Sequence, residues 1–130
     1  MIVDKSALIA ILREESDAAE LSVAIEAAEI RRISAATYVE AAVVTDGNRD
    51  PVLSRRFESF LQEALIHVEP FTLEQARIAC EAYRDFGKGR HRAGLNFGDC
   101  FAYALAKKKG EPLLFKGDDF RKTDVDVVEY

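Results

Sequence analysis

The sequence alternates short apolar runs with longer segments whose apolar residues follow helical spacing, and this alternation restricts the fold more than any other feature. It predicts an α/β fold with a mainly parallel central sheet, because each helix returns the chain to the start of the next strand. The predicted strands are MIVD at residues 1–4, Ile30–Ser34, Leu65–Glu69, PLLF at 112–115 and VDVVEY at 125–130. With 130 residues and no linker-like stretch, the chain is expected to form one domain, 1–130.

The segments between these runs predict helices. Their expected ranges are residues 6–16, Asp17–Ala28, Ala35–Asp46, Pro51–Ala64, Thr72–Phe86 and Phe97–Lys109. Thr72 with Gln75 three residues later is a typical helix start, and Gly110 is a typical helix end. A turn at residues 47–51 is expected to separate two of the helices.

Composition excludes several classes of protein. With 48% hydrophobic and 32% charged residues, the chain is expected to be a soluble globular protein rather than a disordered one. No apolar run approaches the roughly 20 residues of a membrane helix, and the first residues lack the basic region of a signal peptide. Cys80 and Cys100 do not form a metal-type pair, so both are expected to be reduced, buried thiols in a cytoplasmic protein.

Three acidic side chains stand nearly alone in apolar segments. Glu40 is the only charged residue between positions 33 and 45, and Asp99 is the only one between 93 and 106. Asp4 shares the first twelve residues with Lys5 alone. An isolated buried carboxylate is costly, so each of these groups has to be neutralised, paired or coordinated.

Ordinary structural roles are an alternative for each acid. Asp99 can lie in the first turn of a helix capped by Asn96, where the helix dipole stabilises a negative charge by about 0.3–1 kcal/mol. Glu40 can point to solvent at a helix edge, and Asp4 can cap the helix that follows it. These roles explain the acids one at a time but do not explain why all three segments carry one.

The predicted sheet brings these acids together. Asp4 closes the first strand, and Asp118 and Asp119 follow the PLLF run, although either can be a turn residue. In parallel sheets ligands bind at the carboxyl ends of the strands. Carboxylates that converge there need a compensating cation, and oxygen ligands favour Mg²⁺ or Mn²⁺ over Zn²⁺. One or two such ions would activate water for hydrolysis of a phosphodiester.

Four segments resemble the PIN-domain ribonuclease toxins of the VapC type, and the resemblance covers essentially the whole chain. They are MIVDKSALIAIL, ATYVEAAVV, GKGRHRAGLNFGDCFAYALAK and PLLFKGDDFRKTD. The resemblance implies a three-layer α/β/α sandwich around a mainly parallel sheet and an endoribonuclease that depends on Mg²⁺ or Mn²⁺. It also implies inhibition by a VapB-type antitoxin and a toxin that commonly forms a homodimer.

The resemblance also assigns site residues. The family's first acid falls on Asp4, with Ser6 as a supporting hydroxyl. The helix acid falls on Glu40 and the third acid on Asp99. The fourth acid, and with it the last metal ligand, falls on Asp118 or Asp119. Asp119 is favoured because an acid directly before a residue such as Phe120 recurs in the family pattern.

Two positions depart from the family pattern. Gly117 stands where many relatives have an acid, and Lys5 stands where the motif usually has Thr or Ser. If the first strand continues through residue 5, the alternation of side chains turns Lys5 away from Asp4. If the helix has already begun there, the Lys5 ammonium can approach the acids and compete with a metal ion.

A basic loop precedes the last predicted helix and is expected to contact the RNA backbone. Its residues are Lys88, Arg90, His91 and Arg92. His91 is a candidate donor to a phosphate, although an exposed loop histidine is more often without such a role. The net charge of −5 does not favour a protein held to nucleic acid by overall charge.

Two other functions are compatible with these residues. A non-catalytic nucleic-acid or protein binding module would keep the PIN fold and use the acids as a polar network. A phosphatase would use Asp4 as a nucleophile. The haloacid dehalogenase-like pattern, however, requires a second Asp two residues later, where this chain has Ser6.

Overall fold

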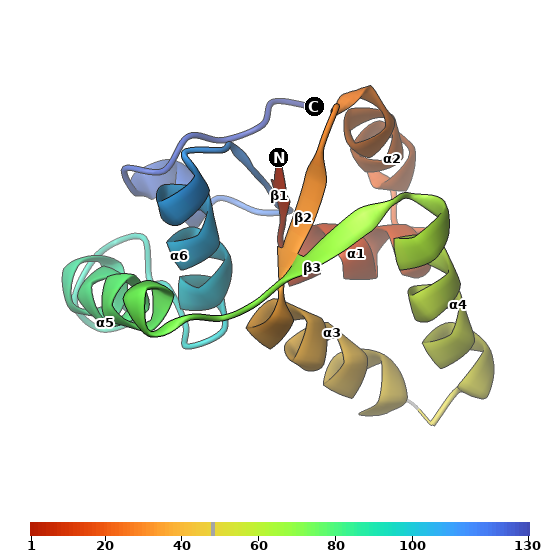
Figure 1. Cartoon of the computed structure of the whole chain (residues 1–130), viewed down its shortest axis with the longest axis horizontal. Helices are drawn as coiled ribbons and strands as arrows, with labels where there is room; N and C mark the ends of the chain where they lie inside the picture. The colour runs from red at the N-terminus through yellow and green to blue at the C-terminus, as the bar shows by residue number, and fades with distance from the viewer. Residues whose placement is uncertain (48) are drawn as a thin grey trace.

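The computed structural model describes residues 1–47 and 49–130, and its centre is a parallel sheet of four short strands (Figure 1). The strands are β1 (Ile2–Val3), β2 (Arg31–Ser34), β3 (Ile66–Glu69) and β4 (Leu113–Leu114), and their order is β3-β2-β1-β4. In the register, Ile2 lies opposite Arg32 on one side and Leu113 on the other. The predicted mainly parallel sheet is therefore confirmed.

Six α-helices and one 3₁₀ turn surround the sheet in the part of the chain that the structure describes. They are α1 (Lys5–Leu12), α2 (Ala18–Ala27), α3 (Ala35–Gly47), α4 (Pro51–Glu63), α5 (Leu73–Phe86), α6 (Asp99–Lys109) and η1 (Phe120–Lys122). Thr72 caps α5 by accepting a hydrogen bond from the Gln75 N–H, as predicted. Gly110 ends α6 in the left-handed conformation that favours glycine.

Strands β1 and β4 share their residues between two cores, which makes the sheet the middle layer of three. Ile2 and Leu113 pack with α5 and α6, whereas Val3 and Leu114 pack with α1, α2, α3 and α4. Figure 1 shows these two groups of helices on opposite sides of the sheet. Consecutive side chains point to opposite faces of a strand, and buried strands therefore read as continuous apolar runs. The expected α/β/α sandwich is confirmed.

The strand order also predicts where a ligand would bind. From β1 the chain adds β2 and then β3 on one side, whereas β4 pairs with β1 on the other side. The order therefore reverses between β1 and β4, and in open α/β sheets ligands bind outside the carboxyl ends at such a point. Asp4 follows β1, and the segment with Asp118 and Asp119 follows β4.

Several expectations for local structure were wrong. VDVVEY is not a strand: only Val127 forms a bridge, to Leu113, because β4 is two residues long and offers little backbone to pair with. The first helix ends at Leu12 instead of continuing to 16, and the last begins at Asp99 instead of Phe97. The expected turn at 47–51 includes residue 48, which lies outside the described residues.

The two cysteines differ in environment. Both are free thiols, as expected, but Cys80 is exposed rather than buried, because it lines an open pocket between α5 and the start of α6. Cys100 is buried at the start of α6. No helix among residues 1–47 and 49–130 has the length and apolar character needed to cross a membrane.

Candidate functional site

Asp4 is fixed at the carboxyl end of β1 by the residues that follow it. It is the N-cap of α1, and its Oδ2 accepts hydrogen bonds from the Ser6 N–H at 2.9 Å and the Ser6 hydroxyl at 2.6 Å. Ser6 Oγ in turn accepts the Lys116 N–H after β4, at 3.0 Å. Burial raises the pKa of Asp4, and the bonds from Ser6 oppose this shift. Ser6 therefore ties Asp4, at the end of β1, to the segment that follows β4.

Asp99 is the first residue of α6 and is held by a reciprocal pair of hydrogen bonds. The Asn96 N–H donates to Asp99 Oδ2, and the Asp99 N–H donates to Asn96 Oδ1, both at 2.9 Å. Burial raises the pKa of Asp99 to about 6, and the charges of Asp4 and Asp119 add to this effect. Asn96 thus accepts a backbone N–H at the start of α6, as predicted, but the N-cap of the helix is Gly98 and not Asn96.

Glu40 reaches the site from α3, which contacts α6. Its carboxylate accepts a hydrogen bond from the Lys5 ammonium and forms an ion pair with it. It also lies against Gly98, so closely that a Cβ on residue 98 would overlap both carboxylate oxygens. The absence of a side chain at Gly98 therefore makes room for Glu40 beside Asp99.

The segment after β4 carries both candidates for the fourth acid. Asp118 and Asp119 are both exposed, but the charge of Asp119 acts on Asp99, whereas that of Asp118 acts on Arg121. Gly117 has a φ of 111°, a left-handed conformation that an acidic side chain would adopt only with strain. The geometry therefore favours Asp119 over Asp118 and explains why this chain has no acid at position 117.

Three of these acids act on the ammonium group of Lys5. Its charge interacts with those of Asp4, Glu40 and Asp99, and although burial lowers the pKa of Lys5, its bond to Glu40 raises it further. Within residues 1–47 and 49–130, no three His, Cys, Asp or Glu side chains converge closely enough to hold a metal ion as they stand. Carboxylate oxygens that already accept one cation nevertheless fit a hard divalent ion.

The basic loop divides into exposed and supporting residues. Lys88, Arg90 and Arg92 are exposed, and Arg90 lies over the ring of Tyr83 at 6.0 Å. His91 is half-buried: its Nδ1 accepts the Ala93 N–H at 3.0 Å, and its ring packs edge-on against Phe86. The structure therefore gives His91 a supporting role in the loop.

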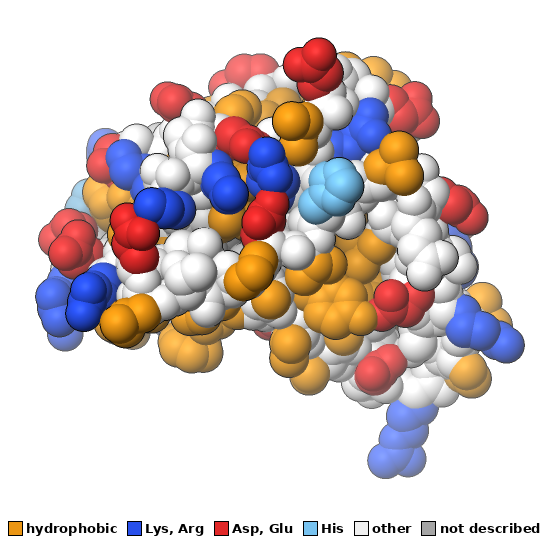
Figure 2. All heavy atoms as spheres, in the orientation of Figure 1, with side chains coloured by type: hydrophobic (Ala, Val, Ile, Leu, Met, Phe, Trp, Pro, Cys, Tyr) orange, Lys and Arg blue, Asp and Glu red, His pale blue; other side chains and the backbone are white. Residues whose placement is uncertain are grey.

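Positive charge is not concentrated on one surface in the view of Figure 2, where lysine and arginine side chains lie among acidic ones. A contact with RNA would therefore be local rather than spread over this face.

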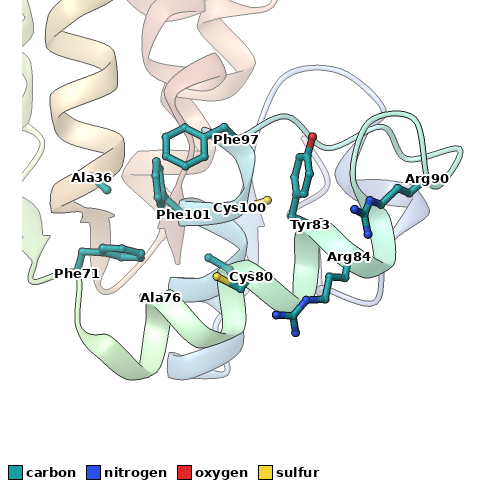
Figure 3. Close-up of a pocket in the computed structure, with 11 residues that line it drawn as sticks. Ala36, Phe71, Ala76, Cys80, Tyr83, Arg84, Arg90, Phe97, Cys100 and Phe101 are labelled. Carbon is teal, nitrogen blue, oxygen red and sulfur yellow. The ribbon is translucent and has the colours of Figure 1, made fainter.

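An apolar pocket that the sequence did not predict lies beside Asp99. It has a volume of about 620 Å³ and runs between α5 and the start of α6 (Figure 3). Phe101 packs edge-on against Phe97 at 4.8 Å and against Phe71 at 5.1 Å. Phe97 is 76% exposed, unusually high for an aromatic residue next to a buried acid. The only hint of this pocket in the sequence was the pair Phe97 and Phe101 on either side of Asp99. Helical spacing alone assigns both phenylalanines to the core.

Replacement of Gly98 by Ala tests the placement of Glu40. Residue 98 has a φ of −66° and a ψ of −37°, which alanine adopts readily, so we expect no loss of stability. The new Cβ would displace the Glu40 carboxylate, and we expect nuclease activity to fall at least about tenfold, since catalytic groups need close positioning. Gly47→Ala is the matched control, because a Cβ there meets no atom within 4 Å. Equal activity of the two variants would contradict the assignment.

Comparison with known proteins identifies relatives along nearly the whole chain. Residues 1–126 match the PIN domain family. The chain is 56% identical over 126 residues to ribonuclease VapC28 of Mycobacterium tuberculosis, covering 96% of this chain and 95% of the relative. It is 48% identical over 128 residues to a ribonuclease VapC of Mycolicibacterium smegmatis, covering 98% and 99%.

Solved structures share the fold at low sequence identity. One is Mycobacterium tuberculosis VapC20, described as a sarcin-ricin loop cleaving toxin, with a TM-score of 0.79 at 16% identity over 99% of this chain and 98% of that one. Another is a toxin–antitoxin complex from Klebsiella pneumoniae, with a TM-score of 0.74 at 18% identity over 99% and 97%.

Proposed function

Since the chain belongs to the PIN-domain family and, within it, to the VapC ribonucleases, we propose that it is the toxin of a toxin–antitoxin pair and cleaves RNA in the cytoplasm. PIN-domain ribonucleases depend on divalent metal ions. We propose Mg²⁺ or Mn²⁺ here, because the available ligands are carboxylate oxygens.

The observation that carries this proposal is the meeting of four acids at the carboxyl ends of β1 and β4. Asp4, Glu40, Asp99 and Asp119 come from four different parts of the sequence, and their charges act on one another. The hydrogen bonds from Ser6 and Asn96 do not offset the cost of burying Asp4 and Asp99. Here burial and mutual repulsion raise the pKa of both Asp4 and Asp99, and a divalent cation would relieve that repulsion.

The protein's own residues would prepare the site in two ways. Ser6 and Asn96 fix the oxygens of Asp4 and Asp99, so little motion is needed to bind a metal ion. A divalent ion held by the acids would lower the pKa of a bound water and neutralise charge on the phosphate. Lys88, Arg90 and Arg92 would hold the RNA backbone beside the acids. We propose that Asp4, Glu40, Asp99 and Asp119 form the catalytic site, with Asp4 and Asp99 as the direct ligands of the metal ion.

Cleavage of total RNA, with and without Mn²⁺ and with mapped product ends, tests this function. We expect cleavage only with Mg²⁺ or Mn²⁺ and its loss on addition of EDTA. Metal-independent binding of RNA without cleavage would favour the alternative of a non-catalytic binding module.

We infer two protein partners from membership of this family. A VapB-type antitoxin would use the apolar groove of about 470 Å³ along α2, which is lined by Val23, Ala24, Ala27 and Tyr130 among others. A second copy of the chain would bury the exposed residues Val39 and Val43 of α3. Light scattering of the protein alone measures the homodimer, and light scattering with the product of the adjacent gene measures the antitoxin complex. A monomer whose mass that product does not change would contradict both partners.

A further inference from the structure

Lys5 lies among the acids of the site, but the proposed function gives it no role. α1 begins at Lys5, directly after the cap Asp4, and this start of the helix brings the ammonium toward the acids rather than away from them. The side chains of Lys5 and Glu40 are 23% and 28% exposed, so their ion pair lies within the site and not on the open surface. The Lys5 charge also attracts both Asp4 and Asp99.

A fixed ammonium changes how many metal ions the acids can hold. In sites with two metal ions, the ions lie about 3.5–4 Å apart and share the surrounding carboxylates. The Lys5 ammonium already occupies the space beside Glu40. It would repel a divalent ion at that distance, and Glu40 is engaged with Lys5 instead of being free to coordinate.

We propose that Lys5 takes the place of one divalent ion, so that the site binds a single metal ion on Asp4 and Asp99 while Glu40 stays paired with Lys5. The inference rests on the proposed metal site. It makes Lys5 a positioning residue, which holds Glu40 against Gly98 and sets the number of ions. Glu40 would then act through Lys5, and its carboxylate would become a metal ligand only when Lys5 is removed.

Calorimetric titration of the full chain with Mn²⁺ in the absence of RNA tests this role. We expect one ion in the wild-type protein. In Lys5→Met, which keeps the length of the side chain without its charge, we expect a second ion or at least about tenfold tighter binding, since a nearby positive charge has been removed. The metal-free variant should also melt at a lower temperature, because the acids lose their cation.

Three further variants separate this role from a general effect of charge or folding. Lys107→Met removes the same charge outside the site, where Lys107 pairs with Asp124. This variant should bind Mn²⁺ as the wild type does. Lys5→Arg keeps the cation and should keep one ion. Lys5→Thr replaces Lys5→Met if the latter does not fold, with the same expectation of a second ion or tighter binding.

The outcomes distinguish the two proposals. Two ions in the wild-type protein, or equal Mn²⁺ binding by the wild type and Lys5→Met, would overturn the role of Lys5 alone. No Mn²⁺ binding by any variant would overturn the proposed metal site as well.

Discussion

Asp99→Asn is expected to abolish metal-dependent RNA cleavage and, in the metal-free protein, to raise the free energy of unfolding at neutral pH. Removal of a charge that stabilises a transition state typically costs at least about 100-fold in rate. The gain in stability follows from the raised pKa of Asp99, about 6 in the folded protein against an ordinary value of 3.8. The asparagine oxygen still accepts the Asn96 N–H, so the start of α6 keeps its bond.

The sign of the stability change is set by the direction of the pKa shift. The folded state binds the Asp99 proton more tightly than the unfolded state, so ionised Asp99 opposes folding. This penalty is absent below about pH 3.8 and complete above about pH 6. At pH 7.5 we therefore expect the free energy of unfolding of Asp99→Asn to exceed that of the wild type by on the order of 1–3 kcal/mol. At pH 3.5 we expect the two free energies to be equal.

Urea unfolding at both pH values, in EDTA, measures this difference. The comparison of variant with wild type cancels the titration of Glu111 and Asp124, whose lowered pKa values act in the opposite direction. Added Mn²⁺ should stabilise the wild type and leave Asp99→Asn unchanged. Full activity in the variant, or a loss of stability at pH 7.5, would refute the roles assigned to Asp99.

Asp4 is expected to combine catalysis with the capping of α1, and two substitutions separate these roles. Asp4→Asn should lower cleavage about 100- to 1000-fold while its side-chain oxygen still accepts the bonds from Ser6. Asp4→Ala should be equally inactive and should also lose the cap, which makes it less stable than Asp4→Asn by about 0.5–2 kcal/mol.

Thermal unfolding and cleavage of a defined RNA measure these two effects. Thr72→Ala is the matched control, because it removes the cap of α5 away from the site and should leave cleavage unchanged. An active Asp4→Asn variant would mean that Asp4 is only a helix cap.

Local spacing was enough to predict most of the fold. The apolar runs MIVD and PLLF are continuous because Val3 and Leu114 face one core and Ile2 and Leu113 the other. The run at 125–130 has similar composition, yet only Val127 pairs, because a strand also needs a partner of sufficient length. Helix starts were predicted where a side chain caps the backbone, as at Thr72, and were less accurate where a turn precedes the helix, as at Phe97.

The sequence predicted the acids of the site one by one, and the tertiary structure showed which residues they contact. Isolation in apolar segments indicated Asp4, Glu40 and Asp99, since a lone buried charge has a high energetic cost. The sequence favoured Asp119 over Asp118 only by its resemblance to the family, and the structure adds that the charge of Asp119 acts on Asp99. The contact of Glu40 with Gly98 joins residues 58 positions apart, and no periodicity encodes it.

The sequence by itself determined the α/β architecture, the order of its elements and the acids that need a cation, because these depend on local spacing and on the energetic cost of burying charge. Only the tertiary structure decided that Lys5 turns toward Glu40, that His91 supports its loop and that an apolar pocket opens beside Asp99. Each of these depends on where the helix begins or how distant segments pack, and such contacts follow from the whole fold rather than from neighbouring residues.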